Sequence, residues 1–169
     1  FYMFHNVCEM NIDAYLDLCE MSDFKGRVNM GPYSTPEIVS DLSRDDVCLY
    51  MTDAWVEPHG VQNPAIYDCF PKFLRDAALG MGDSMEKTVR RMTGAAADRF
   101  QLRERGYLRE GYYADVTVFD EEALKTAVPD QEKSFGIEKV FVNGQLILDG
   151  DRLDAEAAAH SGRAMPVGI

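Results

Sequence analysis

Histidine is scarce in this sequence, which has only three in 169 residues: His5, His59 and His160. Three histidines scattered in this way are too few to form a metal centre by themselves. The four cysteines include no CxxC pair, which argues against a zinc knuckle. We interpret the cysteines as buried, reduced thiols of a cytoplasmic protein.

Basic residues are also in short supply, with 17 Lys and Arg against 29 Asp and Glu and a net charge of −12. A phosphate backbone would be repelled, so nucleic acid is not an expected partner. No apolar run approaches the roughly 20 residues of a membrane span, so no membrane association is expected. The first residues lack an initiator Met and the features of a signal peptide, which is typical of the interior of a longer protein.

Apolar residues at helical spacing predict helices over residues 11–21, 35–45, 63–79 and 83–100. Thr35 and Pro36 form a clear helix start, because Thr can cap and Pro suits the first helical position. Pro71 is expected to interrupt or kink the third helix. Asp83 and Glu86 have the spacing of a capping box at the start of the fourth.

Residues 47–51 form an unbroken apolar run, Val-Cys-Leu-Tyr-Met, which is typical of a strand buried on both faces. Asp53 follows at the C-terminal end, where β/α barrels keep their active sites. There a carboxylate can ligate a metal or accept a proton from a metal-bound water, although an Asp that caps a loop would look the same. His59 lies in the loop that follows. Arg90 and Arg91 are interpreted as a solvated helix face.

The periodicity changes after Gly106. Residues 114–120 predict a strand, and residues 140–148 predict a hairpin, with Asn143 and Gly144 as its type I′ turn. From residue 151 onward the chain is Ala-rich, with a possible helix over residues 153–160 and a frayed end. An α/β part is therefore expected to precede a small β module.

Two sequence segments resemble the C-terminal end of the amidohydrolases: MTGAAADRF (92–100) and RGYLREGYYADVTVFD (105–120). In that superfamily a helix with a T-x-x-x-A pattern leads to the motif G-x-(L/I)-x-x-G-x-x-A-D-(L/V)-x-(V/L)-x-D. GIEKVFVNG (136–144) is similar to the strand and hairpin that follow it. MTDAW (51–55), with His59 downstream, resembles the D-aminoacylase, or N-acyl-D-amino-acid deacylase, branch, in which a short S/T-D-G motif ends the last barrel strand.

The resemblance implies an α/β fragment of a larger fold. Residues 1–105 would hold the last strand and helices of a (β/α)8 metal-dependent hydrolase barrel. Residues 106–150 would be the C-terminal strands of a small β-sandwich, and residues 151–169 a tail. Asp53 would be the catalytic barrel-end aspartate, and in the full-length enzyme a weak or shared metal ligand. His59 would line the mouth of the site and bind substrate. Ala54 stands where this branch usually has Gly.

The implied reaction is hydrolysis of the amide of N-acyl-(D-)amino acids. Zinc in the full-length enzyme would polarise the carbonyl and lower the pKa of its water, and Asp53 would pass the proton to the leaving amine. One alternative is a cyclic-amide hydrolase of the hydantoinase or dihydropyrimidinase kind. Another is a non-catalytic binding or assembly domain. Since one or two strands cannot close a barrel, self-association of the fragment is expected.

We predict that the isolated chain neither binds zinc tightly nor hydrolyses N-acyl amino acids. The H-x-H pair that such enzymes carry on their first barrel strand is absent from these residues, and a zinc site needs several ligands at defined spacing. Elemental analysis of the purified chain tests this. Stoichiometric zinc held with sub-micromolar affinity would contradict it.

Overall fold

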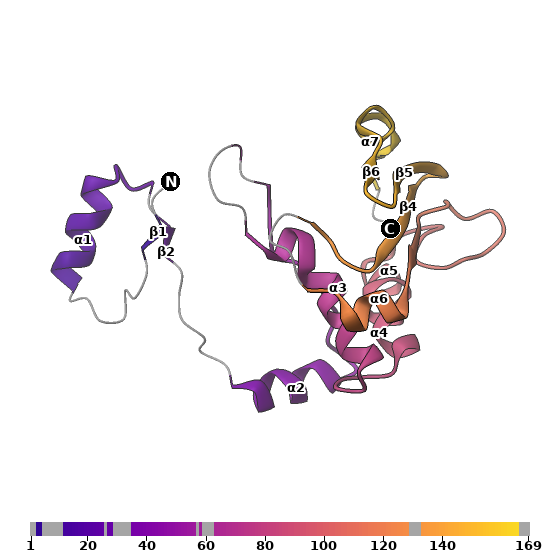
Figure 1. Ribbon diagram of the computed structural model, residues 1–169, viewed down its shortest axis with the longest axis horizontal. Helices are drawn as coiled ribbons and strands as arrows, with labels where there is room; N and C mark the ends of the chain where they lie inside the picture. The colour runs from indigo at the N-terminus through magenta and orange to yellow at the C-terminus, as the bar shows by residue number, and fades with distance from the viewer. Residues whose placement is uncertain are drawn as a thin grey trace.

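The N-terminal part of the chain contains one helix and a short pair of strands (Figure 1). α1 spans Ile12–Met21, which confirms the helix predicted for residues 11–21. It connects β1, Met3–Phe4, with β2, Arg27–Val28, and the two strands pair in parallel. The computed structural model describes residues 3–4, 12–25, 27–28, 35–56, 58, 63–128 and 133–165.

Helix α2 begins where its sequence predicts. It spans Pro36–Arg44, with Thr35 as the N-cap and Pro36 in the first turn. The Thr35 hydroxyl accepts a hydrogen bond from the Ile38 N–H at 3.3 Å, which satisfies one donor that the first turn leaves unpaired. The local signal was sufficient because capping involves only neighbouring residues.

The buried strand predicted for residues 47–51 is wrong. These residues form a turn and then irregular backbone, and Val47 is 85% and Met51 68% exposed. A strand needs a neighbour with which to share its backbone hydrogen bonds, and no described strand pairs with this segment. The apolar run therefore has the composition of a buried strand without the partners that would make it one.

A group of packed helices follows, made up of α3, Ala65–Ala78, α4, Met85–Met92, and α5, Gly94–Phe100. α3 confirms the helix predicted for residues 63–79, but Pro71 does not interrupt it. Proline has no N–H for the carbonyl four residues earlier, which here belongs to Tyr67. The Ser134 hydroxyl donates to the Tyr67 carbonyl at 2.7 Å, so the carbonyl still has a partner.

The single helix predicted to run through to Phe100 is broken at Thr93, whose φ and ψ are −128° and −92°. The Thr93 hydroxyl donates back to the Val89 carbonyl at 2.7 Å, a bond that competes with the helical pattern. Gly94 begins α5 directly beneath the Tyr107 ring. A Cβ at that position would lie 2.6 Å from the ring, so glycine permits this close approach.

The N-cap of α4 is Ser84, not Asp83 as the capping-box spacing suggested. The Ser84 hydroxyl accepts from the Lys87 N–H at 3.3 Å. Asp83 instead forms an ion pair with Arg91, at 3.0 Å from Nε. Asp83 therefore pairs with a side chain about two helical turns further along the chain instead of capping α4.

The C-terminal part is an antiparallel sheet of four strands in the order β3-β4-β5-β6. Asn143 and Gly144 have φ of 49° and 82°, which confirms the predicted type I′ turn between β4 and β5. After β6, a short helix packs against β5 and confirms the one expected beyond residue 153. The elements are β3, Val116–Phe119, β4, Ile137–Val142, β5, Gln145–Asp149, β6, Arg152–Leu153, and α7, Ala155–Ser161.

One helix that the sequence pattern did not predict joins the sheet to the other helices. α6, Glu121–Thr126, is capped by Asp120, whose carboxylate accepts from the Ala123 N–H at 2.8 Å. It packs on α3, and its Leu124 is fully buried with Leu74 and Phe135. Partly buried apolar residues surround this core: Met85, Val89, Met92, Phe119, Ala127 and Ile137.

Large apolar side chains of α2 are uncovered. Ile38, Val39 and Leu42 of α2 are each at least half exposed. Such apolar surface favours association, and self-association of the fragment stays a prediction. In the described residues no helix combines the length and apolar character that crossing a membrane requires.

We predict that Ser134→Ala destabilises the fold by about 0.5–1.5 kcal/mol, the usual net value of one hydrogen bond. The reason is that Pro71 leaves the Tyr67 carbonyl dependent on this hydroxyl. Pro71→Ala restores a helical N–H, so Ser134→Ala should then cost almost nothing. Urea unfolding of the two single variants and the double variant measures this coupling. An equal cost of Ser134→Ala in both backgrounds would contradict the assignment.

Candidate functional site

Asp53 is exposed and lies on an irregular, partly exposed segment that runs from Cys48 to Val56. Its φ is 45°, in the left-handed region, which few residues other than glycine, asparagine and aspartate adopt. The sequence placed Asp53 just beyond a strand, but in the structure it follows irregular backbone. Its side chain is accessible to solvent and to a small molecule.

The segment that leads to Asp53 is fastened to α3 and α4 at three positions. The Arg91 guanidinium donates from Nη1 to the Cys48 carbonyl at 3.3 Å. The Tyr50 ring stacks on Phe73, with centroids 4.0 Å apart and an angle of 9° between the planes. The Cys69 thiol donates to the Met51 carbonyl at 3.3 Å. Contacts with side chains of α3 and α4 thus hold this segment in place, as backbone hydrogen bonds to a neighbouring strand would in a sheet.

Arg91 is the buried member of this arrangement, with only 3% of its surface exposed. Its Nε lies 3.0 Å from Asp83, and its charge lies 5.8 Å over the Tyr50 ring. The expectation that Arg90 and Arg91 form a solvated face is therefore right for Arg90, which is exposed, and wrong for Arg91. A buried guanidinium needs a counter-charge, and Asp83 supplies it.

Two side chains at these fastening points have shifted pKa values. Burial raises the pKa of the Cys69 thiol, and the neighbouring Asp68 carboxylate adds to the effect. Burial likewise raises the pKa of the Tyr50 hydroxyl, and the nearby Arg91 charge opposes it. Both groups are therefore kept neutral at physiological pH, as a packing role requires.

The described residues do not form a metal site by themselves. They contain no group of three or more His, Cys, Asp or Glu side chains that could hold an ion. His59, the predicted substrate-binding residue, lies outside the described residues. Cys19, Cys48 and Cys69 are free thiols.

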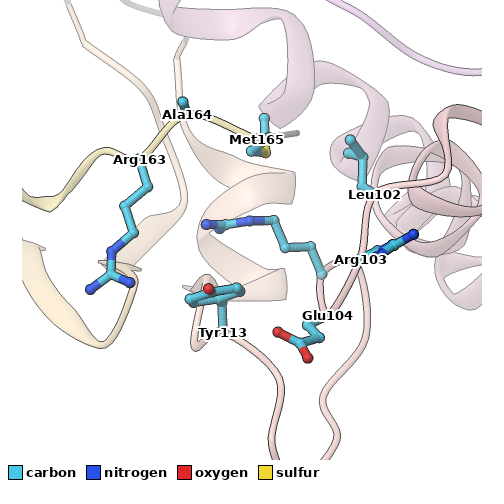
Figure 2. A pocket seen from close by; sticks show the side chains of 8 residues that line it. Leu102, Arg103, Glu104, Tyr113, Arg163, Ala164 and Met165 are labelled. Carbon is cyan, nitrogen blue, oxygen red and sulfur yellow. The ribbon is translucent and has the colours of Figure 1, made fainter. Parts of the chain in front are cut away.

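A cavity of about 300 Å³ lies elsewhere, between the α5–β3 connection and the residues after α7 (Figure 2). Tyr113 lies in its wall, with the Arg105 guanidinium 4.4 Å and that of Arg163 5.7 Å from its ring centroid. Arg105 is paired with Asp115 and also donates to Asn143 at 2.8 Å, so it ties this connection to the β hairpin. Figure 2 shows Arg103 turned away from Tyr113. The cavity does not include Asp53, and we assign it to the packing of the β module.

Sequence reasoning did not find Arg91, Tyr50 or Phe73 as parts of the site. Arg91 looks like its exposed neighbour Arg90 in the sequence, and its burial depends on a partner 43 positions away. One feature of the sequence could have indicated the burial of Arg91. It stands eight residues after Asp83, about two helical turns, so the two side chains can lie along one face and pair.

The chain belongs to the amidohydrolase family, because the sequence model described as "Amidohydrolase family" matches residues 61–148. Within this family it is similar to enzymes of the D-aminoacylase type. It is 43% identical over 77 residues to an N-acyl-D-aspartate deacylase of Alcaligenes xylosoxydans xylosoxydans, covering 43% of this chain. It is 33% identical over 113 residues to a D-aminoacylase of the same organism, covering 64% of this chain.

Solved structures agree. A crystal structure of D-aminoacylase has a TM-score of 0.53 and 33% identity, covering 62% of this chain and 22% of that one. A structure from work on the binuclear metal centre of D-aminoacylase has the same TM-score and 32% identity, with the same coverage. The mixed helix and strand content of this chain is thus that of part of an amidohydrolase.

The similarity concerns a minor part of each relative. This chain spans 15% of the deacylase and 23% of the D-aminoacylase. The family match begins at residue 61, after Asp53 and His59. The family therefore rests on α3 to β5, whereas the roles of the two residues rest on their chemistry and their position.

We predict that Cys69 reacts slowly with thiol reagents in the folded chain, because only the thiolate reacts and burial raises the pKa of Cys69. The neutral thiol is favoured in the fold. Its contribution to stability is therefore complete below the unfolded pKa and is lost as pH rises through the higher folded pKa. A variant in which Cys69 is the only cysteine allows the rate to be measured against pH, with and without urea, and Cys69→Ala is the control for stability. Equal rates in the two states would contradict the prediction.

Proposed function

We propose that this chain is the C-terminal part of a metal-dependent hydrolase that cleaves the amide bond of N-acyl-D-amino acids. The observation that carries the proposal is its similarity to two relatives named for such reactions, an N-acyl-D-aspartate deacylase and a D-aminoacylase. We expect the 169 residues to be inactive alone, because the H-x-H metal pair of such enzymes is not among them.

Asp53 is the catalytic base in this proposal. A water oxygen attacks the acyl carbon, and its proton passes to the Asp53 carboxylate. The C–N bond then breaks, and Asp53 delivers the proton to the leaving nitrogen, so that a carboxylate and a free amino acid are formed. The exposed position of Asp53 and its left-handed backbone support this role, because unusual backbone conformations gather at functional sites.

The whole enzyme would hold zinc, bound mainly by residues that are not among these 169. A related D-aminoacylase is described as having a binuclear metal centre. Asp53 would be a weak or shared ligand. His59 would contact the substrate at the mouth of the site.

In the whole protein we place residues 1–105 in a (β/α)8 barrel, with α3, α4 and α5 as helices of its outer layer. Residues 106–150 would belong to a β-sandwich, which strands β3, β4 and β5 would help to form. Residues 151–169 would be a tail that begins with β6 and α7. The reduced thiols are in keeping with a cytoplasmic enzyme.

We favour linear N-acyl amino acids over the cyclic amides considered from the sequence, because both curated relatives are named for linear amides. A non-catalytic binding domain is the other alternative. It would not need Asp53 in a solvent-accessible, left-handed position, and it predicts that substitutions there have no effect on turnover.

We predict that Asp53→Asn in the full-length enzyme lowers kcat by about 10² to 10⁴, the usual contribution of a general base. Asparagine has nearly the same shape but cannot accept the proton. Steady-state hydrolysis of N-acetyl-D-amino acids measures the effect, and circular dichroism shows that the fold is intact. A variant with near-normal kcat would move the base elsewhere.

His59→Ala is the matched comparison in the same loop. It should act mainly on KM, because we assign His59 to binding at the mouth of the site. A loss of kcat as large as that of Asp53→Asn would instead give His59 a part in the chemistry.

A further inference from the structure

We infer that Arg91 is a positioning residue for Asp53, and that it acts by fastening the main chain at Cys48 to helix α4. The inference rests on the proposed function, because it assigns a role toward the proposed base. Arg91 itself does not touch the substrate. Its contribution is to hold the segment that leads to Asp53 in one orientation.

The first step is the geometry of the segment. Its ties to the helices come at Cys48, Tyr50 and Met51, and the last of them is two residues before Asp53. No described strand pairs with this stretch, so these side-chain contacts replace the backbone ladder that would otherwise hold it. We therefore expect the loss of one tie to change the position of Asp53.

The second step is that Arg91 joins two of the three ties. Its Nη1 holds the Cys48 carbonyl, and its charge lies over the Tyr50 ring. That ring is stacked in turn on Phe73 of α3. The guanidinium thus links α4, the segment and, through Tyr50, α3.

The third step is the placement of Arg91 within its helix. Asp83 just before α4 balances the charge from 3.0 Å, and Asp46 lies 3.7 Å away from the side of the segment. Nη2 is buried and forms no hydrogen bond among the described residues, and the Asp46 carboxylate at 3.7 Å is its ion-pair partner. Asp83 and Asp46 thus balance the charge of the guanidinium, while Nη1 donates to the Cys48 carbonyl.

A guanidinium suits this task better than an ammonium. It presents several donors in a fixed plane, so it can face Asp83 and the Cys48 carbonyl at the same time. A lysine in its place keeps the charge next to Asp83 but cannot hold both partners in that geometry. Arg91→Lys therefore separates charge balance from positioning.

The test uses the full-length enzyme and begins with the wild type. Hydrolysis of N-acetyl-D-amino acids by the wild type tests the proposed function alone. Arg91→Met is then expected to lower kcat by roughly tenfold to a hundredfold, the effect of misplacing a catalytic group by about an ångström. KM should change little. The kcat of Arg91→Lys should lie between that of the wild type and that of Arg91→Met.

Two further variants test whether the loss of kcat comes from an unpaired buried charge at Asp83 or from any substitution on this part of α4. Arg91→Met leaves Asp83 as a buried charge without a partner, so the double variant Arg91→Met with Asp83→Asn keeps the fold while the tie to Cys48 is still lost. Its kcat should be as low as that of Arg91→Met. Arg90→Met is the matched control, one position away on the exposed side of the same helix, and should retain wild-type kcat.

The decisive measurement is the same substitution in the Asp53→Asn background. If Arg91 acts through Asp53, Arg91→Met causes no further loss of kcat once Asp53 can no longer accept a proton. A merely structural role would lower kcat by the same factor in both backgrounds, and that result would overturn the inference. Wild-type kcat in the Arg91→Met variant would also overturn it.

Hydrogen exchange gives a readout that does not depend on activity. The amides of residues 48–53 should exchange faster in Arg91→Met than in the wild type or in Arg90→Met. Unchanged exchange there would mean that Arg91 does not hold the segment. If the wild type is inactive but exchange is faster in Arg91→Met, the proposed function is refuted. Arg91 would then hold the segment without any role in catalysis.

Discussion

The packing of α6 against α3 is the contact on which the rest of this structure depends. Leu124 is buried there, and Arg75 of α3 lies 4.5 Å over the Phe135 ring while it donates to the carbonyls of Leu124, at 2.7 Å, and Ala127. The last turn of a helix leaves its carbonyls unpaired and carries partial negative charge, so a guanidinium satisfies both needs. Because α6 lies between β3 and β4 in the chain, this contact joins the sheet to the helices.

Two buried or half-buried arginines thus connect separate parts of the molecule, and both do so through main-chain carbonyls. Arg75 connects α3 to the end of α6, and Arg91 connects α4 to the segment that carries Asp53. A carbonyl oxygen belongs to every residue, so the acceptor leaves no mark in the sequence. This explains why sequence reasoning selected Asp53, whose side chain has its own chemistry, but not the residue that holds its backbone.

Several parts of the fold could be predicted because their causes are local. Thr35 caps α2 through a bond to a residue three positions away, and Asn143 and Gly144 can adopt the left-handed backbone of their turn. α6 was missed because it is short and largely polar, with a single fully buried side chain, so it shows little periodicity. The strand over residues 47–51 was predicted from composition, but a strand also requires neighbours. The site was predicted as one candidate side chain, not as an arrangement.

The sequence by itself determined the family motifs after residue 92, the turn and cap residues, and the candidate carboxylate at Asp53. Only the tertiary structure decided that Arg91 is buried while Arg90 is exposed, that Asp83 serves an ion pair instead of a cap, and that Ser134 completes α3 around Pro71. The physical reason is the range of the interactions. A hydrogen bond closed within one helical turn depends on a few adjacent residues, whereas a buried charge or an unpaired carbonyl is satisfied by whatever group the fold brings beside it.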